Sequence, residues 1–238
     1  MINTMLIKCD FFRARVMAQF NTLEDYISYA EGQIQESHHS TRCQILIENR
    51  TPPDASEEVV QEWLDAREQE LDDCDRRYAV DFRRILRFTI IMSAYSLAEL
   101  SLSMIAKEIR NRKGLASKKD KAKKTLDRFE GFWTKVAQMP WWSDPRWDML
   151  KDIRELRNCI AHRNGVVREN DGRIEQLVHR DCGVRLVGVK DPLADPDEAR
   201  TLEIEERFCR KAVEEMRTLF DEIFNRAGCF GPDHIVVG

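Results

Sequence analysis

The segment RELRNCIAHRNG brings an arginine, an asparagine and a histidine close together, as Arg157, Asn158 and His162. A guanidinium binds phosphate oxygens through several N–H donors, and an imidazole gains and loses protons near neutral pH. Gly165 follows closely, which is typical of the residues that end a helix. The three side chains are therefore candidates for handling a phosphodiester near the carboxyl end of a helix.

Helical spacing places only part of this group on one face. Residues five apart on a helix are separated by about 140° in projection, so Arg157 and His162 point in different directions. Asn158 and His162 are four apart and share a face, which Arg154 extends by one turn. A single helix thus supplies only part of a pocket, and a second copy of the chain across a two-fold axis would complete it.

A purely structural interpretation of the same residues is also open. His162 would then cap the last carbonyl groups of the helix, while Arg154 and Arg157 would pair with Glu155 or Asp152. Because charged helices are common, spacing alone favours this interpretation.

Composition bounds the class of protein. The 238 residues suit one large domain, or one domain with additions, and the 42% of hydrophobic residues are enough for a core. Ten glycines and seven prolines are few for a turn-rich β fold. With a formal net charge of −4, contact with nucleic acid must come from a local basic patch. The seven cysteines are scattered without a CxxC motif, so we expect no metal site and no cofactor.

The amino terminus and the apolar runs predict the compartment. The start of the chain lacks the pattern of a signal peptide, because Lys8 and Asp10 precede any long apolar run. The longest mostly apolar run without a charge, residues 88–98, is too short to span a bilayer. We therefore expect a cytoplasmic protein with no membrane partner.

Apolar periodicity predicts helices over most of the chain. The expected helices cover about 10–49, 56–112, 126–136, 145–163 and 203–226. The second would run roughly 85 Å if unbroken, and a polar cluster at 72–75 could break it. Its central part, residues 88–100, is apolar on nearly all sides and should be buried by several partners or by a second subunit.

Between the last two helices the pattern changes to strands. Asp171 and Gly172 stand between the apolar runs 166–167 and 174–178, which is typical of a hairpin turn, and 184–189 predicts a further strand. We predict a mainly α fold, an up-and-down helical bundle with a small β-hairpin insertion at about 166–190, before the last helix. Residues 1–50 would form an amino-terminal helical segment and 51–238 the bundle, or both would form one continuous domain.

The R-N-x-x-x-H pattern at Arg157, Asn158 and His162 resembles the defining motif of HEPN-domain proteins. The order of elements over about residues 80–226 is similar as well: an apolar helix with a polar tip, a connecting helix, the motif helix and a closing helix. This resemblance implies a dimeric helical bundle. In many members it also implies a metal-independent endoribonuclease that leaves a 2′,3′-cyclic phosphate and a 5′-hydroxyl.

The resemblance also implies residue roles. Arg157 would hold the phosphate, His162 would transfer a proton, and Asn158 would orient one of the two. Glu99 is an acidic group on the apolar helix and needs a partner. It would either position Arg157 and His162, or simply pair with a core-facing arginine.

Further residues are candidates for contact with RNA. The basic ones are Arg154, Arg163, Lys118, Lys119 and Lys121, although the lysine run is more typical of a solvated loop. The tryptophans Trp133, Trp141, Trp142 and Trp147 would stack on bases or, more commonly, pack around the end of the bundle. His38 and His39 have no ligand partners at zinc spacing and are expected at the surface.

Three functions follow as hypotheses. The first is a homodimeric, metal-independent endoribonuclease with RNA as substrate, acting as a toxin or in phage defence, with an antitoxin or other regulatory protein as a further partner. The second is a non-catalytic HEPN-like module that binds RNA, a nucleotide or a protein. The third is a purely structural helical protein.

Overall fold

The computed structural model describes residues 4–48, 55–112, 126, 129, 131, 144–168, 171–180, 182–188 and 200–226. Its helices are α1 (Thr4–Glu48), α2 (Glu57–Asp75), the π-helix η1 (Arg76–Phe82), α3 (Arg83–Arg112), α5 (Pro145–Arg163), α6 (Gly172–His179) and α7 (Glu206–Arg226). Its strands are β1 (Val166–Val167), β2 (Val184–Gly188) and β3 (Arg200–Ile204). The predicted fold class, mainly α with a small β insertion, is confirmed.

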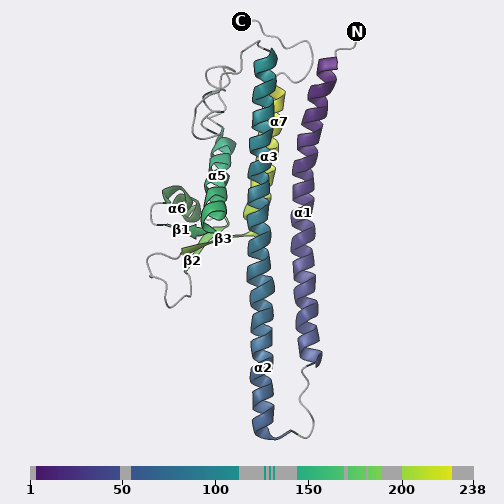
Figure 1. The fold of residues 1–238 in the computed structure, drawn as a ribbon, viewed down its shortest axis with the longest axis vertical. Coiled ribbons are helices and arrows are strands. Elements are labelled where there is room, and N and C mark those ends of the chain that lie inside the picture. Colours follow the sequence, from purple (N-terminus) through teal and green to yellow (C-terminus); the bar gives the residue numbers. More distant parts are fainter. Residues whose placement is uncertain are drawn as a thin grey trace.

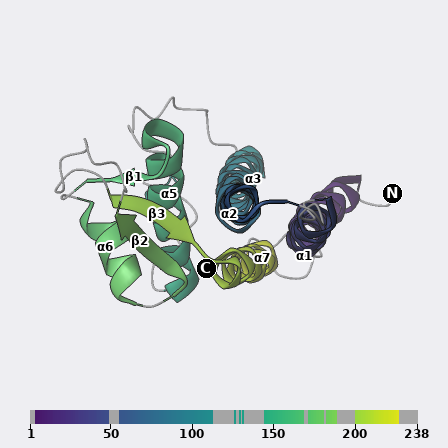
Figure 2. The same ribbon diagram turned by 90° about the horizontal axis from the view of Figure 1, so that it is seen from below.

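Two long rods dominate the molecule. In Figure 1, α1 runs beside a continuous rod formed by α2, η1 and α3, and the lower ends of both extend beyond the other elements. In Figure 2, α7 lies against α3 and α1, while α5, α6 and the strands lie on the side of α3 and α7 away from α1.

The core forms where α1, α3, α5 and α7 meet. From α1, Val16, Phe20 and Ile27 are buried, and Phe20 packs on Phe220 of α7 with ring centroids 5.6 Å apart. Burial of one such side chain stabilises the fold by roughly 1.5–3 kcal/mol. Because Val16, Phe20 and Ile27 belong to the same core as residues of the later helices, α1 packs together with α3, α5 and α7.

The long second helix does not break at the polar cluster near residues 72–75, where the sequence allowed a break. The chain continues from α2 into α3 through the seven-residue η1. Asp75 binds Arg42 and His38 of α1 and does not compete for the backbone of its own helix. With neither Pro nor Gly to stop it, the helix changes only its hydrogen-bonding pattern.

The same rod meets the length and composition of a membrane span. Within the described residues, one such helix is found, Glu57–Asn111, with a mean hydropathy of 1.5 in its most apolar window. Half of that window is buried inside the protein, and a core helix of a soluble protein passes the same test of length and composition.

The predicted hairpin turn at Asp171 and Gly172 is wrong. The residues after it form α6, whose Ile174 and Leu177 are buried on one face, a spacing that suits a helix. The three strands form an antiparallel sheet in the order β1-β3-β2. β3 comes from residues 200–204, so the last helix begins at Glu206 and not at Glu203.

Helix α5 ends in a left-handed turn that packs closely on α3. Asn164 has φ 51°, and the backbone N–H groups of Asn164 and Gly165 donate to the carbonyls of Ile160 and Cys159. Gly165 has φ +82°, and a Cβ there would lie 2.7 Å from the Phe88 ring. Only glycine fits this position without strain.

Gly165→Ala should therefore destabilise the protein by about 2 kcal/mol or more, because the added methyl adopts an unfavourable φ and meets Phe88. Urea unfolding followed by circular dichroism measures the change. Gly172→Ala is the matched control, since an added Cβ there meets nothing within 4 Å. Equal stability of the two variants would contradict the role of this close contact.

Candidate functional site

The motif lies on α5, whose boundaries match the predicted helix. Asp144 caps its amino end by accepting a hydrogen bond from the Arg146 backbone N–H at 2.9 Å, and Pro145 occupies the first turn. Ile153 and Leu156 are fully buried, as expected for the core face. The polar residues of the motif consequently lie on the opposite face and its flanks.

Arg157 is half-buried in a distinctive environment. Its guanidinium carbon lies 5.8 Å from the centroid of the Tyr95 ring on α3, and its Nη1 donates to Asn158 Oδ1 at 3.2 Å. Its Nε is buried and has no hydrogen-bond partner among the described residues. A buried donor without a partner is costly, so the described residues do not fully satisfy this guanidinium.

The neighbouring charges are paired, whereas Arg157 has no ion pair within the described part of the chain. Arg154 binds Glu155 at 3.0 Å, as the structural interpretation of the motif expects. Asp152 is fully buried and binds Arg173 of α6 and Arg180, the residue directly after α6, at 2.6 and 2.7 Å. These pairs use the two carboxylates that were predicted to bind Arg157. Among the described residues, Arg157 makes no ion pair.

Tyr95 and Glu99 of α3 face the arginines of α5. Burial, and then the charge of Glu99, raise the pKa of Tyr95 to about 12, although Arg154 and Arg157 oppose the shift. Glu99 is half-buried, but among the described residues no hydrogen bond or ion pair joins it to Arg157. A positioning role for Glu99 stays a prediction.

His162 is exposed on the last turn of α5. It follows Asn158 by four residues, so the two share one face, and Arg157 lies on the flank next to α3. Within the described part of the chain, no hydrogen bond orients the imidazole. The structure thus brings Arg157 and Asn158 into contact and leaves His162 open to solvent.

Other predicted contacts to RNA have mixed outcomes. Arg163 binds Asp171 beside β1. Burial would raise the pKa of Asp171, but hydrogen bonds from Arg163 and the Arg168 backbone N–H lower it below its usual value. The guanidinium of Arg163 is therefore engaged within the protein. Lys118, Lys119 and Lys121 lie outside the described residues, as do Trp133, Trp141 and Trp142, while Trp147 is fully buried and packs in the core.

A second polar cluster was missed by sequence reasoning. His38 of α1, expected at the surface, is half-buried and lies 2.7 Å from Asp75 of α2, and the ligand atoms of His38, Asp75 and Cys74 all lie within 4.8 Å of one another. Arg42 binds the other oxygen of Asp75, and its positive charge opposes a cation at this point. We interpret the cluster as a set of polar contacts that hold α1 and α2 together. A separation of 36 residues between His38 and Cys74 gives no local signal of it.

The comparisons with known proteins are negative. No family model, no curated protein and no solved structure matches this chain. Functional inference therefore depends on the geometry of the residues themselves.

The contacts of Asp75 with Arg42 and His38 predict that the stability of the protein depends on pH. Hydrogen bonds from Arg42 and then His38 lower the pKa of Asp75 below its usual 3.8. A carboxyl group whose pKa is lower in the folded state stabilises the fold above its unfolded pKa, and this contribution is lost as the pH falls through its folded pKa. Asp75→Asn should therefore be less stable than the parent protein at pH 6, and the difference should shrink toward about pH 3.

Urea unfolding at several pH values measures this difference. Asp73→Asn is a suitable control, because Asp73 is half-exposed and its only ion pair among the described residues is with Arg76, three residues further along the same rod. If the Asp75 variant and the parent protein differed in free energy of unfolding by the same amount down to pH 3, the assigned role of the ionised carboxylate would be contradicted.

Proposed function

We propose that this protein is a HEPN-like, metal-independent endoribonuclease that acts as a cytoplasmic homodimer, as a toxin or in phage defence. The observation that carries the proposal is Arg157. Its guanidinium is half-buried against Tyr95, its Nε lacks a partner, and no carboxylate among the described residues neutralises it. A cation held in this way is typical of an anion site, because a structural arginine would have an acidic partner.

The chemistry is a transesterification of the RNA backbone. The 2′-hydroxyl attacks the adjacent phosphorus, the bond to the 5′-oxygen breaks, and a 2′,3′-cyclic phosphate and a 5′-hydroxyl result. Arg157 stabilises the negative charge that develops on the phosphate oxygens. His162 transfers a proton to the departing 5′-oxygen or from the attacking hydroxyl. Asn158, which accepts a hydrogen bond from Arg157, fixes the direction of the guanidinium.

The exposed face of α3 supports a homodimer. Uncharged side chains occupy it over several turns: Ile85, Thr89, Ser93, Ser96, Leu100, Ser103 and Met104. Leu100 and Ile85 are 57% and 60% exposed, which is high for apolar residues on a helix. The hydroxyls of Thr89 and Ser96 donate to carbonyls of their own helix, so their hydrogens are not available for hydrogen bonds to water. This face adjoins Tyr95 and Glu99, so a second copy packed there would lie beside Arg157.

A second candidate function is a non-catalytic binding module. The specific observation in its favour is that His162 has no hydrogen bond among the described residues. A catalytic histidine is commonly oriented by a second group. In this function Arg157 and Asn158 would bind a phosphate without cleavage.

His162→Ala should abolish cleavage of RNA by the purified protein in the presence of EDTA, because the proton transfer is lost. General acid–base catalysis contributes about 10²–10⁴-fold to the rate, so the cleavage rate of the variant should be at least about 100-fold below that of the parent protein. His179→Ala is the control, because His179 is an exposed histidine on α6. Cleavage is followed on labelled RNA, with analysis of the 3′ ends for the cyclic phosphate.

The outcomes separate the candidates. Full activity in the His162 variant would refute the proposed mechanism. Saturable RNA binding without cleavage by the parent protein, lost in Arg157→Gln, would support the binding module.

Mixing two inactive variants tests whether the site is shared between subunits. If Arg157 of one subunit acts with His162 of the other, a heterodimer of Arg157→Ala and His162→Ala contains one intact site. Random exchange between equal amounts makes about half of the dimers heterodimers, each with one of its two sites intact. The mixture should therefore regain about one quarter of the parent activity. Mixing either variant with itself is the control. No recovery, despite confirmed subunit exchange, would show that both residues act from the same chain.

A further inference from the structure

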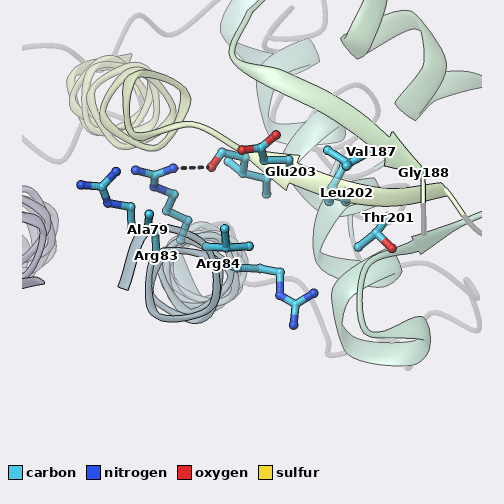
Figure 3. Close-up of a pocket in the computed structure, with 11 residues that line it drawn as sticks. Ala79, Arg83, Arg84, Val187, Gly188, Thr201, Leu202 and Glu203 are labelled. Atoms are coloured by element: carbon cyan, nitrogen blue, oxygen red, sulfur yellow. Dashed lines mark hydrogen bonds between the residues drawn. The ribbon is translucent and has the colours of Figure 1, made fainter. Parts of the chain in front are cut away.

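A pocket of about 360 Å³ lies between the amino-terminal part of the α3 rod and the strands (Figure 3). One wall is formed by η1 and the first turns of α3, and the other by β2 and β3. No residue of the proposed RNA site lines it. Its function must therefore be sought in its own side chains.

The apolar part of the pocket comes from two distant segments. Val80 of η1 is 54% exposed and Val187 of β2 is 48% exposed, and both line this one cavity. Leu202 of β3 contributes to the wall between them. Apolar side chains that remain half open to water and converge on a concave surface are typical of a ligand site.

A cation and a hydroxyl complete the lining. Figure 3 shows Arg84 extending from the helix on the side of the strands, with Thr201 of β3 on the opposite wall. The side chain of Arg84 is 41% exposed and forms a long ion pair with Asp81, whose carboxylate oxygen lies 3.9 Å from a guanidinium nitrogen. That distance is too long for a hydrogen bond. Its planar set of N–H donors is thus open to an oxyanion.

The other charged residues that line the pocket are of both signs, two arginines and one glutamate. Arg87 is fully engaged with Glu31 and the Ile204 carbonyl. Arg83 lies 3.7 Å from Glu31, and its Nε is buried with no hydrogen-bond partner among the described residues. Glu203 also lines the pocket, because it shares a face of β3 with Thr201 while Leu202 and Ile204 point the other way, so one carboxylate stands on the strand wall two residues from the Thr201 hydroxyl.

The backbone of the helical wall is also unusual. Ala79 and Val80 belong to the π-helix η1, which replaces the ordinary α-helical pattern over residues 76–82. Such segments are rare and occur frequently at functional sites, since they redirect side chains locally. The π-helix is an observation independent of the charges, and it points to the same cavity.

We propose that this pocket binds a small organic anion that carries a phosphate or carboxylate group on a compact apolar body. The anionic group binds Arg84 and the Thr201 hydroxyl, and the apolar body packs on Val80 and Val187. The volume of about 360 Å³ falls within the range of roughly 300–1,000 Å³ that is typical of small-molecule sites. This binding is separate from the proposed cleavage of RNA.

Calorimetry on the full chain tests the proposal with 1-naphthyl phosphate as the probe. Because the probe joins both halves of the expected ligand, it should bind at least about 10-fold more tightly than inorganic phosphate or 1-naphthol. 1-Naphthoate, compared in parallel, shows whether phosphate or carboxylate is the preferred anionic group. No saturable binding of either naphthyl anion would overturn the proposal.

Substitutions locate the binding. Arg84→Gln should weaken binding of the probe at least about 10-fold, and Thr201→Val should weaken it less, because one neutral hydrogen bond is lost. Arg76→Gln is the matched control, since Arg76 lies on η1 but outside the pocket and is 71% exposed. Arg157→Gln should leave binding unchanged. Equal binding by the Arg84 and Arg76 variants, or loss of binding in the Arg157 variant, would refute the proposed site.

Discussion

A buried ion pair between α1 and α3 connects the parts of this molecule. Arg87 of α3 binds both carboxylate oxygens of Glu31 in α1, at 2.7 and 3.2 Å, and donates a further hydrogen bond to the Ile204 carbonyl of β3 at 3.1 Å. Both side chains are largely buried. Loss of one partner from such a pair leaves an uncompensated buried charge, which costs about 3–5 kcal/mol. The pair therefore fixes which faces of α1, α3 and β3 meet.

From this pair the structure continues to the motif helix. Next to Arg87, Phe88 packs against Gly165, the glycine that ends α5. The Gly165 carbonyl accepts a hydrogen bond from the Leu202 backbone N–H of β3 at 2.8 Å. β3 thus joins the carboxyl end of the motif helix to the start of α7. The exposed His162 precedes this turn by three residues, so the core sets its position although the imidazole itself faces solvent.

Arg157 differs in charge pairing from the other arginines of α5. Arg146 binds Asp144 and Glu222, Arg154 binds Glu155, and Arg163 binds Asp171. Arg157 instead contacts the Tyr95 ring and a neutral amide. A half-buried arginine that has no acidic partner among the described residues lowers stability relative to a paired one.

Local sequence patterns were sufficient to predict much of this fold. Apolar periodicity located the first helix and the motif helix. Asp144 and Pro145 marked the start of α5, while Gly165 marked its end, because caps and turns depend on neighbouring residues. The spacing of Ile153 and Leu156 gave the buried face, and the polar face bearing Asn158 and His162 followed from it.

Contacts between distant residues decided the remainder. Residues 174–178 suit a strand or a helix by local preference, and α6 forms because Arg173 and Arg180, seven apart, both reach the buried Asp152. Likewise, residues 200–204 pair with β2, and that pairing is not encoded in their own spacing. The isolation of Arg157 from carboxylates and the pocket beside Arg84 depend on which helices pack together. Local propensity cannot specify either feature, since each is formed by residues that meet only in the folded chain.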